Sequence, residues 1–524
     1  MTDARSIGYV RTEDAPILPP PPGTAGVMGW LRQNLFPSFG NAILTIVIGL
    51  FLALVAWSII DWAIIRAVWS GVDRESCAVE GAGACWPFVW AKFPQWLYGF
   101  YTISERWRPS LLFVIAVVAL IPMLMPSAPY KQWNALFLLV VFPVIGLILL
   151  SGGNFDFSWS TYAGLLALGF LGAVLIPFFN GGIESGIKSN VPGVALALIA
   201  LLPAMMWFVA EVVAAAGGLV AIAIGFNPLT PVSAWLLQFN TWIDTGVIPL
   251  GRFFFGFALA AGLVTFIGLF LKHGAAAFRS IIGWGGLVLA LLAILLALDI
   301  DFGLVPVETA NWGGLLVTLV VSVTGIVASL PLGILLALGR RSRMPIVRLM
   351  SIVFIEIWRG VPLITVLFMA SVMLPLFFPE GTSFDKLLRA LIGISLFSAA
   401  YMAEVVRGGL QAIGKGQYEG AMALGLSYWQ MMGKIILPQA LKISIPNIVG
   451  NFIGLFKDTT LVLIIGIYDF LGIITAGTQD AKWASPQTGS TGYFAAAIIY
   501  WAFCFGMSRY ATYTEQRLNT GHKR

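Results

Sequence analysis

One stretch of this sequence has the residue types and spacing of a phosphate-binding loop. Gly409, Gly414 and Lys415 form a G-x-x-x-x-G-K pattern, in which backbone N–H groups and the lysine would cradle the phosphates of ATP. A working loop also needs a strand before it and a Ser or Thr after the lysine to hold Mg²⁺. Gly416 takes that position, and an apolar helix precedes the loop. We therefore expect no ATP, Mg²⁺ or other cofactor to bind to this chain itself.

Acid–base and metal chemistry have less support. The two histidines, His273 and His522, lie in a basic loop and in the C-terminal tail, and neither is accompanied by a set of metal ligands. The three cysteines are scattered along the chain. We expect no catalytic residue and no metal site, so the chain is not predicted to be an enzyme.

Ionisable side chains inside apolar stretches are the remaining candidates for function. The six are Glu356, Arg359, Glu404, Arg407, Lys457 and Asp458. The first four form two pairs at a spacing of three residues, which places each pair on one helix face. The last two are adjacent, so they point different ways and need partners elsewhere. Charges at membrane depth are costly and indicate function. The alternative, which we favour for Glu404 and Arg407, is that they tie helices together near the interface.

The composition around these residues is that of a membrane protein. Of 524 residues, 59% are hydrophobic and 10% are charged, whereas soluble domains have about 25% charged residues. Each of twelve apolar runs is long enough to cross a hydrocarbon core of ~30 Å as a helix. The runs are 41–65, 110–126, 135–151, 161–179, 193–217, 251–271, 280–298, 313–339, 349–378, 387–412, 441–468 and 491–513. We predict an all-α integral membrane protein with about 12 transmembrane helices.

Loop composition predicts the orientation of these helices. Lysine and arginine concentrate in the loops on the side of the N-terminus, most strongly at 340–348, and acidic residues dominate the other side. We therefore expect both termini to be cytoplasmic. Cys77 and Cys85 then lie outside, where a disulfide persists, although two unpaired small residues would explain them as well. The aromatic segments 86–106 and 231–247 are expected at the membrane interface. The net charge of +6 is spread over short loops, which argues against nucleic acid as a partner.

A loop of about thirty residues near the C-terminal end has a specific spacing. Glu-Gly-Ala at 419–421 is followed after three residues by a glycine, and after nine more by Ile-Ile-Leu-Pro at 435–438. The motif residues are Glu419, Gly420, Ala421, Gly425, Ile435, Leu437 and Pro438. Residues 417–424 predict two helical turns ended by Gly425, and small residues at 420, 421 and 423 would let another protein approach. Pro438 and Pro446 are expected to break helicity where the chain re-enters the bilayer.

This spacing resembles the EAA signature of the permease subunits of ATP-binding-cassette (ABC) importers, with Gly420 in place of the usual alanine. Segments 312–342, 354–369, 403–421 and 455–462 are similar to polar amino-acid uptake permeases. The long N-terminal addition and residues 306–315 resemble the general L-amino-acid systems of Gram-negative bacteria. The resemblance implies a type I permease core of five helices at 299–515, with a cytoplasmic coupling loop at 414–440. Before it lie a Pro-rich tail (1–40) and an added region of about seven helices (41–298), and after it a tail (516–524).

The resemblance also implies a function. A permease subunit of this kind translocates L-amino acids of broad, polar specificity across the bacterial inner membrane. ATP and Mg²⁺ would be bound by separate ABC ATPase subunits, a homodimer that grips residues 414–440. A periplasmic amino-acid-binding protein and a second, different permease chain would complete the assembly, with membrane lipid around it. The six charged residues would line the translocation path or its gate, where Arg359 would meet a substrate carboxylate or hold the gate.

Two alternatives stay open from the sequence. A 12-helix ion-coupled secondary transporter is expected to repeat six-span halves, and no such repeat is evident. A channel is expected to contain a selectivity-filter motif, which the sequence also lacks.

Overall fold

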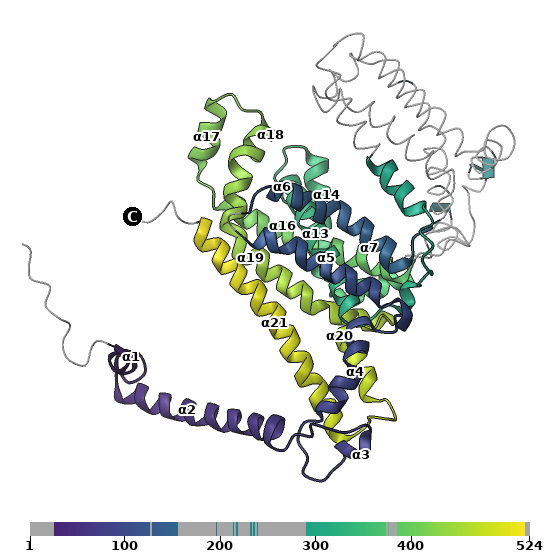
Figure 1. Ribbon diagram of the computed structural model, residues 1–524. Coiled ribbons are helices and arrows are strands. Elements are labelled where there is room, and N and C mark those ends of the chain that lie inside the picture. The colour runs from purple at the N-terminus through teal and green to yellow at the C-terminus, as the bar shows by residue number, and fades with distance from the viewer. Residues whose placement is uncertain are drawn as a thin grey trace, which may run out of the picture. The chain divides into compact units, whose positions relative to one another are not determined.

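The computed structural model describes residues 26–125, 128–155, 290–373, 376 and 385–518, and nine single residues between 195 and 238. These residues form helices and connecting loops without a β-strand. The chain divides into two compact units, Met1–Phe100 with Ala310–Arg524, and Tyr101–Thr309. The chain is therefore all-α, as predicted (Figure 1).

Seven helical segments in the described part of the chain are long and apolar enough to cross a membrane. They are Phe39–Ile65, Ile103–Leu124, Lys131–Ser151, Gly314–Arg340, Lys386–Ala412, Tyr428–Ile465 and Pro486–Leu518. Each coincides with a predicted run. The predicted runs 161–179, 193–217 and 251–271 lie outside the described residues, and 280–298 is described only from residue 290, where Ala290–Asp299 is a short apolar helix. The total of about twelve stays a prediction.

The predicted run 349–378 does not form one straight helix. It consists of α14 (Pro345–Gly360) and α15 (Leu363–Val372), which are bent by 103° at the break. Pro362 lacks an N–H donor, and its ring pushes the preceding Val361 out of helical geometry, to φ −107° and ψ 135°. The prediction of a single span was therefore wrong in geometry, and the break places α14 at a steep angle to α15.

Pro438 and Pro446 do not break the helix, contrary to expectation. The segment runs through α18 (Tyr428–Met431), a π-helical turn η7 (Met432–Ile436), α19 (Leu437–Asp458) and the 3-10 turn η8 (Thr459–Ile465). Pro438 lies in the first turn of α19, where its missing N–H costs little. Pro446 lies inside α19, and membrane helices tolerate this because neighbouring groups and local adjustments compensate the freed carbonyl.

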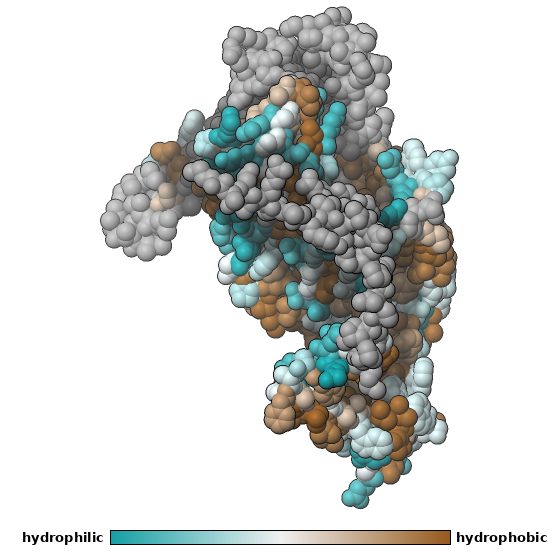
Figure 2. All heavy atoms as spheres, turned by 90° about the vertical axis from the view of Figure 1, so that its left-hand side faces the viewer, coloured by the Kyte–Doolittle hydropathy of each residue, from teal (hydrophilic) through white to brown (hydrophobic). Residues whose placement is uncertain are grey.

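The first unit is built around α13 (Gly314–Arg340) and α16 (Lys386–Gln411), which pack closely. Small residues permit the approach: a Cβ added to Gly333 of α13 would lie 2.7 Å from the Met402 Cβ and 3.0 Å from the Ala403 backbone nitrogen. This is the usual way in which helices associate where lipid replaces water. Apolar side chains remain exposed over the described surface, and none of the residues of α2 (Phe39–Ile60) is buried (Figure 2).

One end of the first unit is formed by α3 (Arg74–Cys77), α4 (Trp86–Tyr98), α20 (Phe470–Thr478) and the start of α21 (Pro486–Leu518). Phe88 and Trp96 of α4 are fully buried against α20 and α21. α4 thus packs into the protein with one side, and the expectation that residues 86–106 lie at the membrane interface stays a prediction. The second aromatic segment, 231–247, lies outside the described residues except for five single positions.

The second unit contains η2 (Ile103–Glu105), α5 (Trp107–Leu124), α6 (Lys131–Leu136), a π-turn η3 (Phe137–Val141) and α7 (Phe142–Ser151). The buried Arg108 donates to the Val305 carbonyl (2.7 Å) and forms an ion pair with Glu105 (2.6 Å). The Tyr101 hydroxyl donates to the Leu150 carbonyl (3.0 Å). The contacts of Arg108 hold residue 305 against the start of α5. The Tyr101 hydrogen bond holds the end of α7 against the segment that precedes η2.

Candidate functional site

The Glu-Gly-Ala motif lies on α17 (Lys415–Ala423), a nine-residue helix between α16 and α18. Gly425 ends it with φ +70°, its N–H donates to the Met422 carbonyl (2.9 Å), and the Leu426 N–H donates to the Ala421 carbonyl (3.3 Å). This is the Schellman pattern, which satisfies the last carbonyls of a helix and favours glycine at the left-handed position. The predicted helix and its glycine cap are confirmed. The chain thus presents a short helix with a fixed end.

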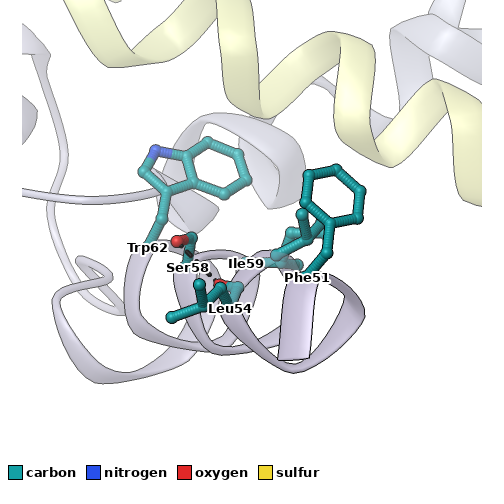
Figure 3. A pocket seen from close by; sticks show the side chains of 6 residues that line it. Phe51, Leu54, Ser58, Ile59 and Trp62 are labelled. Carbon is teal, nitrogen blue, oxygen red and sulfur yellow. Dashed lines mark hydrogen bonds between the residues drawn. The ribbon is translucent and has the colours of Figure 1, made fainter. Parts of the chain in front are cut away.

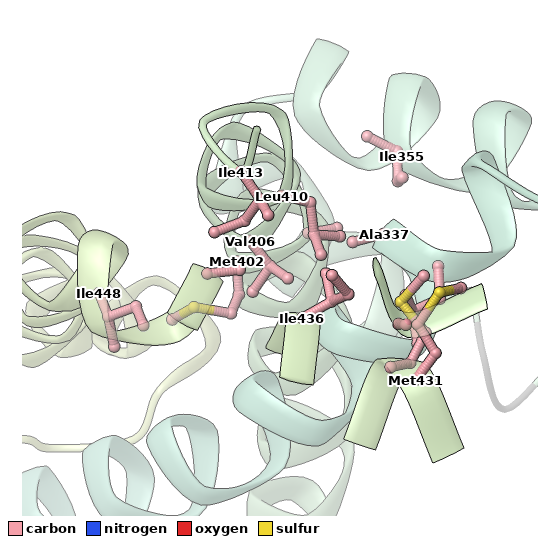
Figure 4. Packing of buried hydrophobic residues seen from close by; sticks show 14 residues of the cluster. Ala337, Ile355, Met402, Val406, Leu410, Ile413, Met431, Ile436 and Ile448 are labelled. Carbon is pink, nitrogen blue, oxygen red and sulfur yellow. The ribbon is translucent and has the colours of Figure 1, made fainter. Parts of the chain in front are cut away.

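Fewer of the small residues of α17 are exposed than the sequence predicts. Glu419, Gly420 and Ala423 are exposed, but Ala421 is 1% exposed and packs into the protein. It belongs to a buried cluster that includes Leu410, Ile413, Met431 and Ile436 (Figure 4 labels these four). The expectation that small residues at 420, 421 and 423 are all open to a partner was wrong for Ala421. Its methyl group holds α17 onto the ends of the membrane helices.

Large apolar side chains project from the same loop. Met422 is 58% exposed, Leu424 75% and Trp429 67%. Ser427 begins α18 with a capping box to Gln430, which fixes the turn between the two short helices. Exposed apolar groups rimmed by polar ones are typical of a protein interaction site. Together with Glu419, they form a surface that we call the α17–α18 face: Glu419, Gly420, Met422, Leu424 and Trp429.

The second half of the motif has a packing role. Ile435 and Leu437 are half-buried against the same cluster, and Pro438 is exposed in the first turn of α19. These residues do not belong to the α17–α18 face. They connect it to α19 through the π-turn.

A charged cluster lies where the C-terminal ends of α13, α14 and α16 meet. Glu404 is its centre, with one oxygen 2.7 Å from an Arg340 nitrogen and the other 2.6 Å from Arg407 and 3.8 Å from Arg359. The expected pairing of Glu404 with Arg407 is confirmed. Glu356 pairs with Arg340 (3.0 Å) instead of with Arg359, so the expected pair within α14 is not formed.

Glu356 pairs with Arg340 because the neighbouring helix α13 supplies a closer cation than α14 itself does. Arg340 is the last residue of α13 and reaches the acidic groups of both α14 and α16. Arg359 instead lies over the Tyr401 ring, 5.7 Å from its centroid. The sequence had placed Arg340 in a basic loop, and its position one residue beyond an apolar run was the signal that could have added it to the site. The cluster holds three arginines and two glutamates and therefore has a net positive charge.

Lys457 and Asp458 are both exposed at the end of α19. Within the described part of the chain, no hydrogen bond or ion pair engages either side chain. The structure therefore does not bring them into the charged cluster.

Cys77 and Cys85 form a disulfide at the α3–α4 end of the first unit, and α17 and α18 lie at its opposite end (Figure 1). The disulfide packs in a buried cluster with Phe88, Trp96 and Phe470. The disulfide covalently closes the loop between α3 and α4.

A shallow hollow lies along α2, lined by apolar side chains and one hydroxyl (Figure 3). Its residues are Phe51, Leu54, Val55, Ser58, Ile59 and Trp62. The Ser58 hydroxyl is already occupied, because it donates to the Leu54 carbonyl (2.9 Å). The hollow offers no charged group to an ionic substrate. Among the described residues, no group of His, Cys, Asp and Glu is arranged to hold a metal ion.

Comparison with known proteins gives a consistent picture. Residues 329–520 match the family described as binding-protein-dependent transport system inner membrane component. The chain is 37% identical over 507 residues to the inner membrane amino-acid ABC transporter permease protein YhdY of Escherichia coli, covering 96% of this chain and 97% of that one.

It is 36% identical over 525 residues to the glutamate/glutamine/aspartate/asparagine transport system permease protein BztC of Rhodobacter capsulatus, covering 98% and 99%. A crystal structure of an amino acid ABC transporter with histidines aligns at 27% identity over 39% of this chain and 92% of that one, with a TM-score of 0.35. The two relatives extend along the whole chain, including the region before the core.

Proposed function

The chain belongs to the family of binding-protein-dependent inner-membrane transport components, the permease subunits of ABC importers, and we propose that its substrates are L-amino acids of broad, polar specificity. As a member of this family it is a multi-pass inner-membrane protein with an ATPase partner. Support for the substrate class comes from two full-length relatives, both named as amino-acid permeases and one named for two acidic amino acids and their amides.

The α17–α18 face docks the ATPase in this proposal. The observation that carries it is a short helix with a Schellman cap, whose Glu419 and Gly420 lie open beside exposed Met422 and Leu424. ATP and Mg²⁺ then bind to the partner, a homodimer, and this chain holds no cofactor and catalyses no reaction. A second, different permease chain and a periplasmic amino-acid-binding protein complete the assembly, and membrane lipid covers the remaining apolar surface.

The orientation follows from two observations at opposite ends of the first unit. The disulfide between Cys77 and Cys85 persists in an oxidising compartment, which favours the periplasm for that end. Lysine and arginine gather at the α17 end, in the 340–348 turn, which favours the cytoplasm. Both termini are cytoplasmic in this arrangement.

The charged cluster acts as the inner gate of the translocation path. Arg340 pairs with Glu404 and Glu356, and Arg359 pairs with Glu404. These contacts tie α13, α14 and α16 together, so separating the helices requires breaking partly buried ion pairs. Lys457 and Asp458, exposed on α19, line the path or meet the second permease chain.

Charge reversal at Glu419 tests the docking claim. Glu419→Lys places a cation on the α17–α18 face without altering a buried contact, because Glu419 is exposed. We expect the ATPase to be lost from detergent-purified complexes. Glu308→Lys is the matched control, since it makes the same charge change at another exposed glutamate, outside the α17–α18 face. Retention of the ATPase at wild-type affinity by Glu419→Lys would refute docking at this face.

A further inference from the structure

Two adjacent arginines at the end of α13 reach in different directions. Arg340 contacts the glutamates of α14 and α16 in the charged cluster. Arg341 caps α13 and turns the other way, where one of its guanidinium nitrogens donates to the Tyr418 hydroxyl (3.0 Å) and to the Leu410 carbonyl (3.3 Å). The guanidinium carbon also lies 5.5 Å from the centroid of the Tyr418 ring. Arg341 therefore engages both the hydroxyl and the ring of one side chain.

Tyr418 lies on the inward side of α17, where it is half-buried. Its hydroxyl donates to the same Leu410 carbonyl at 3.3 Å, so this carbonyl, near the end of α16, accepts from both side chains. Arg341, Tyr418 and Leu410 thus join the ends of α13, α17 and α16. We call these three residues the Arg341 clasp.

α17 has two further attachments. Ala421 inserts into the buried cluster, which also contains Ala337 and Leu338 of α13. The Gln439 side-chain amide of α19 donates to the Gln417 side-chain oxygen (3.2 Å). The other residues of α17 are exposed. Among the described residues, the clasp is thus the polar link from α17 to α13, and a separate polar link leads to α19.

We propose that Arg341 is a positioning residue that transmits the movement of α17 to α13 and, through the neighbouring Arg340, to the charged cluster. The inference rests on the proposed docking of the ATPase at the α17–α18 face. Consecutive Cα atoms are held about 3.8 Å apart, so a displacement of the Arg341 backbone also displaces the backbone of Arg340. The planar guanidinium of Arg341 donates hydrogen bonds to oxygens and at the same time lies over the Tyr418 ring, a combination that a lysine ammonium cannot reproduce. The clasp therefore links the partner's movement to the ion pairs that close the gate.

The test uses the complete transporter in proteoliposomes, with its ATPase and binding protein, and measures substrate transported per ATP hydrolysed. The variants are Arg341→Gln, Tyr418→Phe and the two combined. Arg343→Gln is the matched control, because Arg343 is an exposed arginine of the same turn without a hydrogen bond or ion pair to a described residue. Tyr418→Phe retains the packed ring and removes only the hydroxyl, which guards against a folding defect.

We expect each single change to lower the transport ratio about fivefold or more, a typical coupling between sites. The amount of bound ATPase and its basal hydrolysis should stay at the wild-type level, as should all values of Arg343→Gln. The double variant should be no worse than the more affected single variant, because both changes break the same contact. An unchanged ratio in Arg341→Gln, or effects that multiply in the double variant, would overturn the proposal.

Loss of the ATPase from Arg341→Gln would also overturn it, because the residue would then belong to docking. Failure of the docking proposal itself is read separately, from retention of the ATPase by Glu419→Lys.

Discussion

Gly425 offers the sharpest test of how the segment between α16 and α19 is built. Its backbone is left-handed, at φ +70°, and its N–H closes the cap of α17. No heavy atom lies within 4 Å of a Cβ added there, so a side chain would meet no steric obstacle. Any effect of a substitution on the cap of α17 must therefore come from the backbone conformation.

The size of that effect follows from the conformational preference of L-residues. The left-handed region costs a non-glycine residue about 1–2 kcal/mol, and asparagine adopts it more readily than most. Since 1.4 kcal/mol is a factor of about ten, Gly425→Val should lower the population of the capped turn about 5- to 30-fold. Gly425→Asn should have a smaller effect. Gly420→Ala is the control, because Gly420 has equally open surroundings inside the helix, where alanine is favoured by about 1 kcal/mol.

Titration of the ATPase onto purified permease, with hydrogen exchange of the α17 amides, measures these effects. We expect affinity and protection to fall in the order Gly420→Ala, wild type, Gly425→Asn, Gly425→Val. If Gly425→Val binds the ATPase as tightly as wild type while α17 loses protection, the capped end of α17 does not position the dock, and the reasoning is refuted.

Three further predictions, the first with a matched comparison variant, concern the rest of the fold. Glu404→Gln leaves its arginines without their shared carboxylate and should lower the free energy of unfolding by about 1–3 kcal/mol. Glu356→Gln changes a side chain that is 54% exposed and should lower it by less than about 1 kcal/mol. Equal losses would contradict the placement of Glu404 at the centre of the charged cluster. The Lys92 ammonium, hydrogen-bonded to Asp480, holds the pKa of that carboxyl below its usual range. The pair therefore stabilises the fold above the unfolded pKa of about 3.9 and is lost as pH falls through the lower folded value. Thermal unfolding of Asp480→Asn should depend less on pH in this acidic range, and an identical pH profile would count against the pair. Gly333→Val would place a Cβ 2.7 Å from an α16 side chain and should lower the free energy of unfolding by about 1–3 kcal/mol; unchanged thermal stability would argue against close packing of α13 on α16.

Local features of the site could be predicted from the sequence because their causes are local. The helix at 415–423 and its glycine cap depend on residues within one or two turns, and the Glu404–Arg407 pair depends on helical spacing alone. The span positions depend on apolar runs, and seven of the runs in the described part of the chain agree with the structure, whereas the run 349–378 is bent at Pro362.

Features that depend on neighbouring helices could not be predicted. Whether Ala421 faces inward, and whether Glu356 pairs with Arg340 or Arg359, depends on how α13, α14, α16 and α17 are placed together. The burial of α4 likewise comes from α20 and α21, far along the sequence. The bend at Pro362 had a local signal in its proline, but hydropathy continues across it and hides the break.

We infer that this permease draws its energy from an ATPase that docks on the α17–α18 face. Uptake of radiolabelled amino acids into proteoliposomes that hold the complete assembly tests this inference. We predict uptake that requires ATP inside and binding protein outside, that survives collapse of proton and sodium gradients, and that is abolished by Glu419→Lys. Uptake driven by an ion gradient without ATP would contradict the claim and favour a secondary transporter.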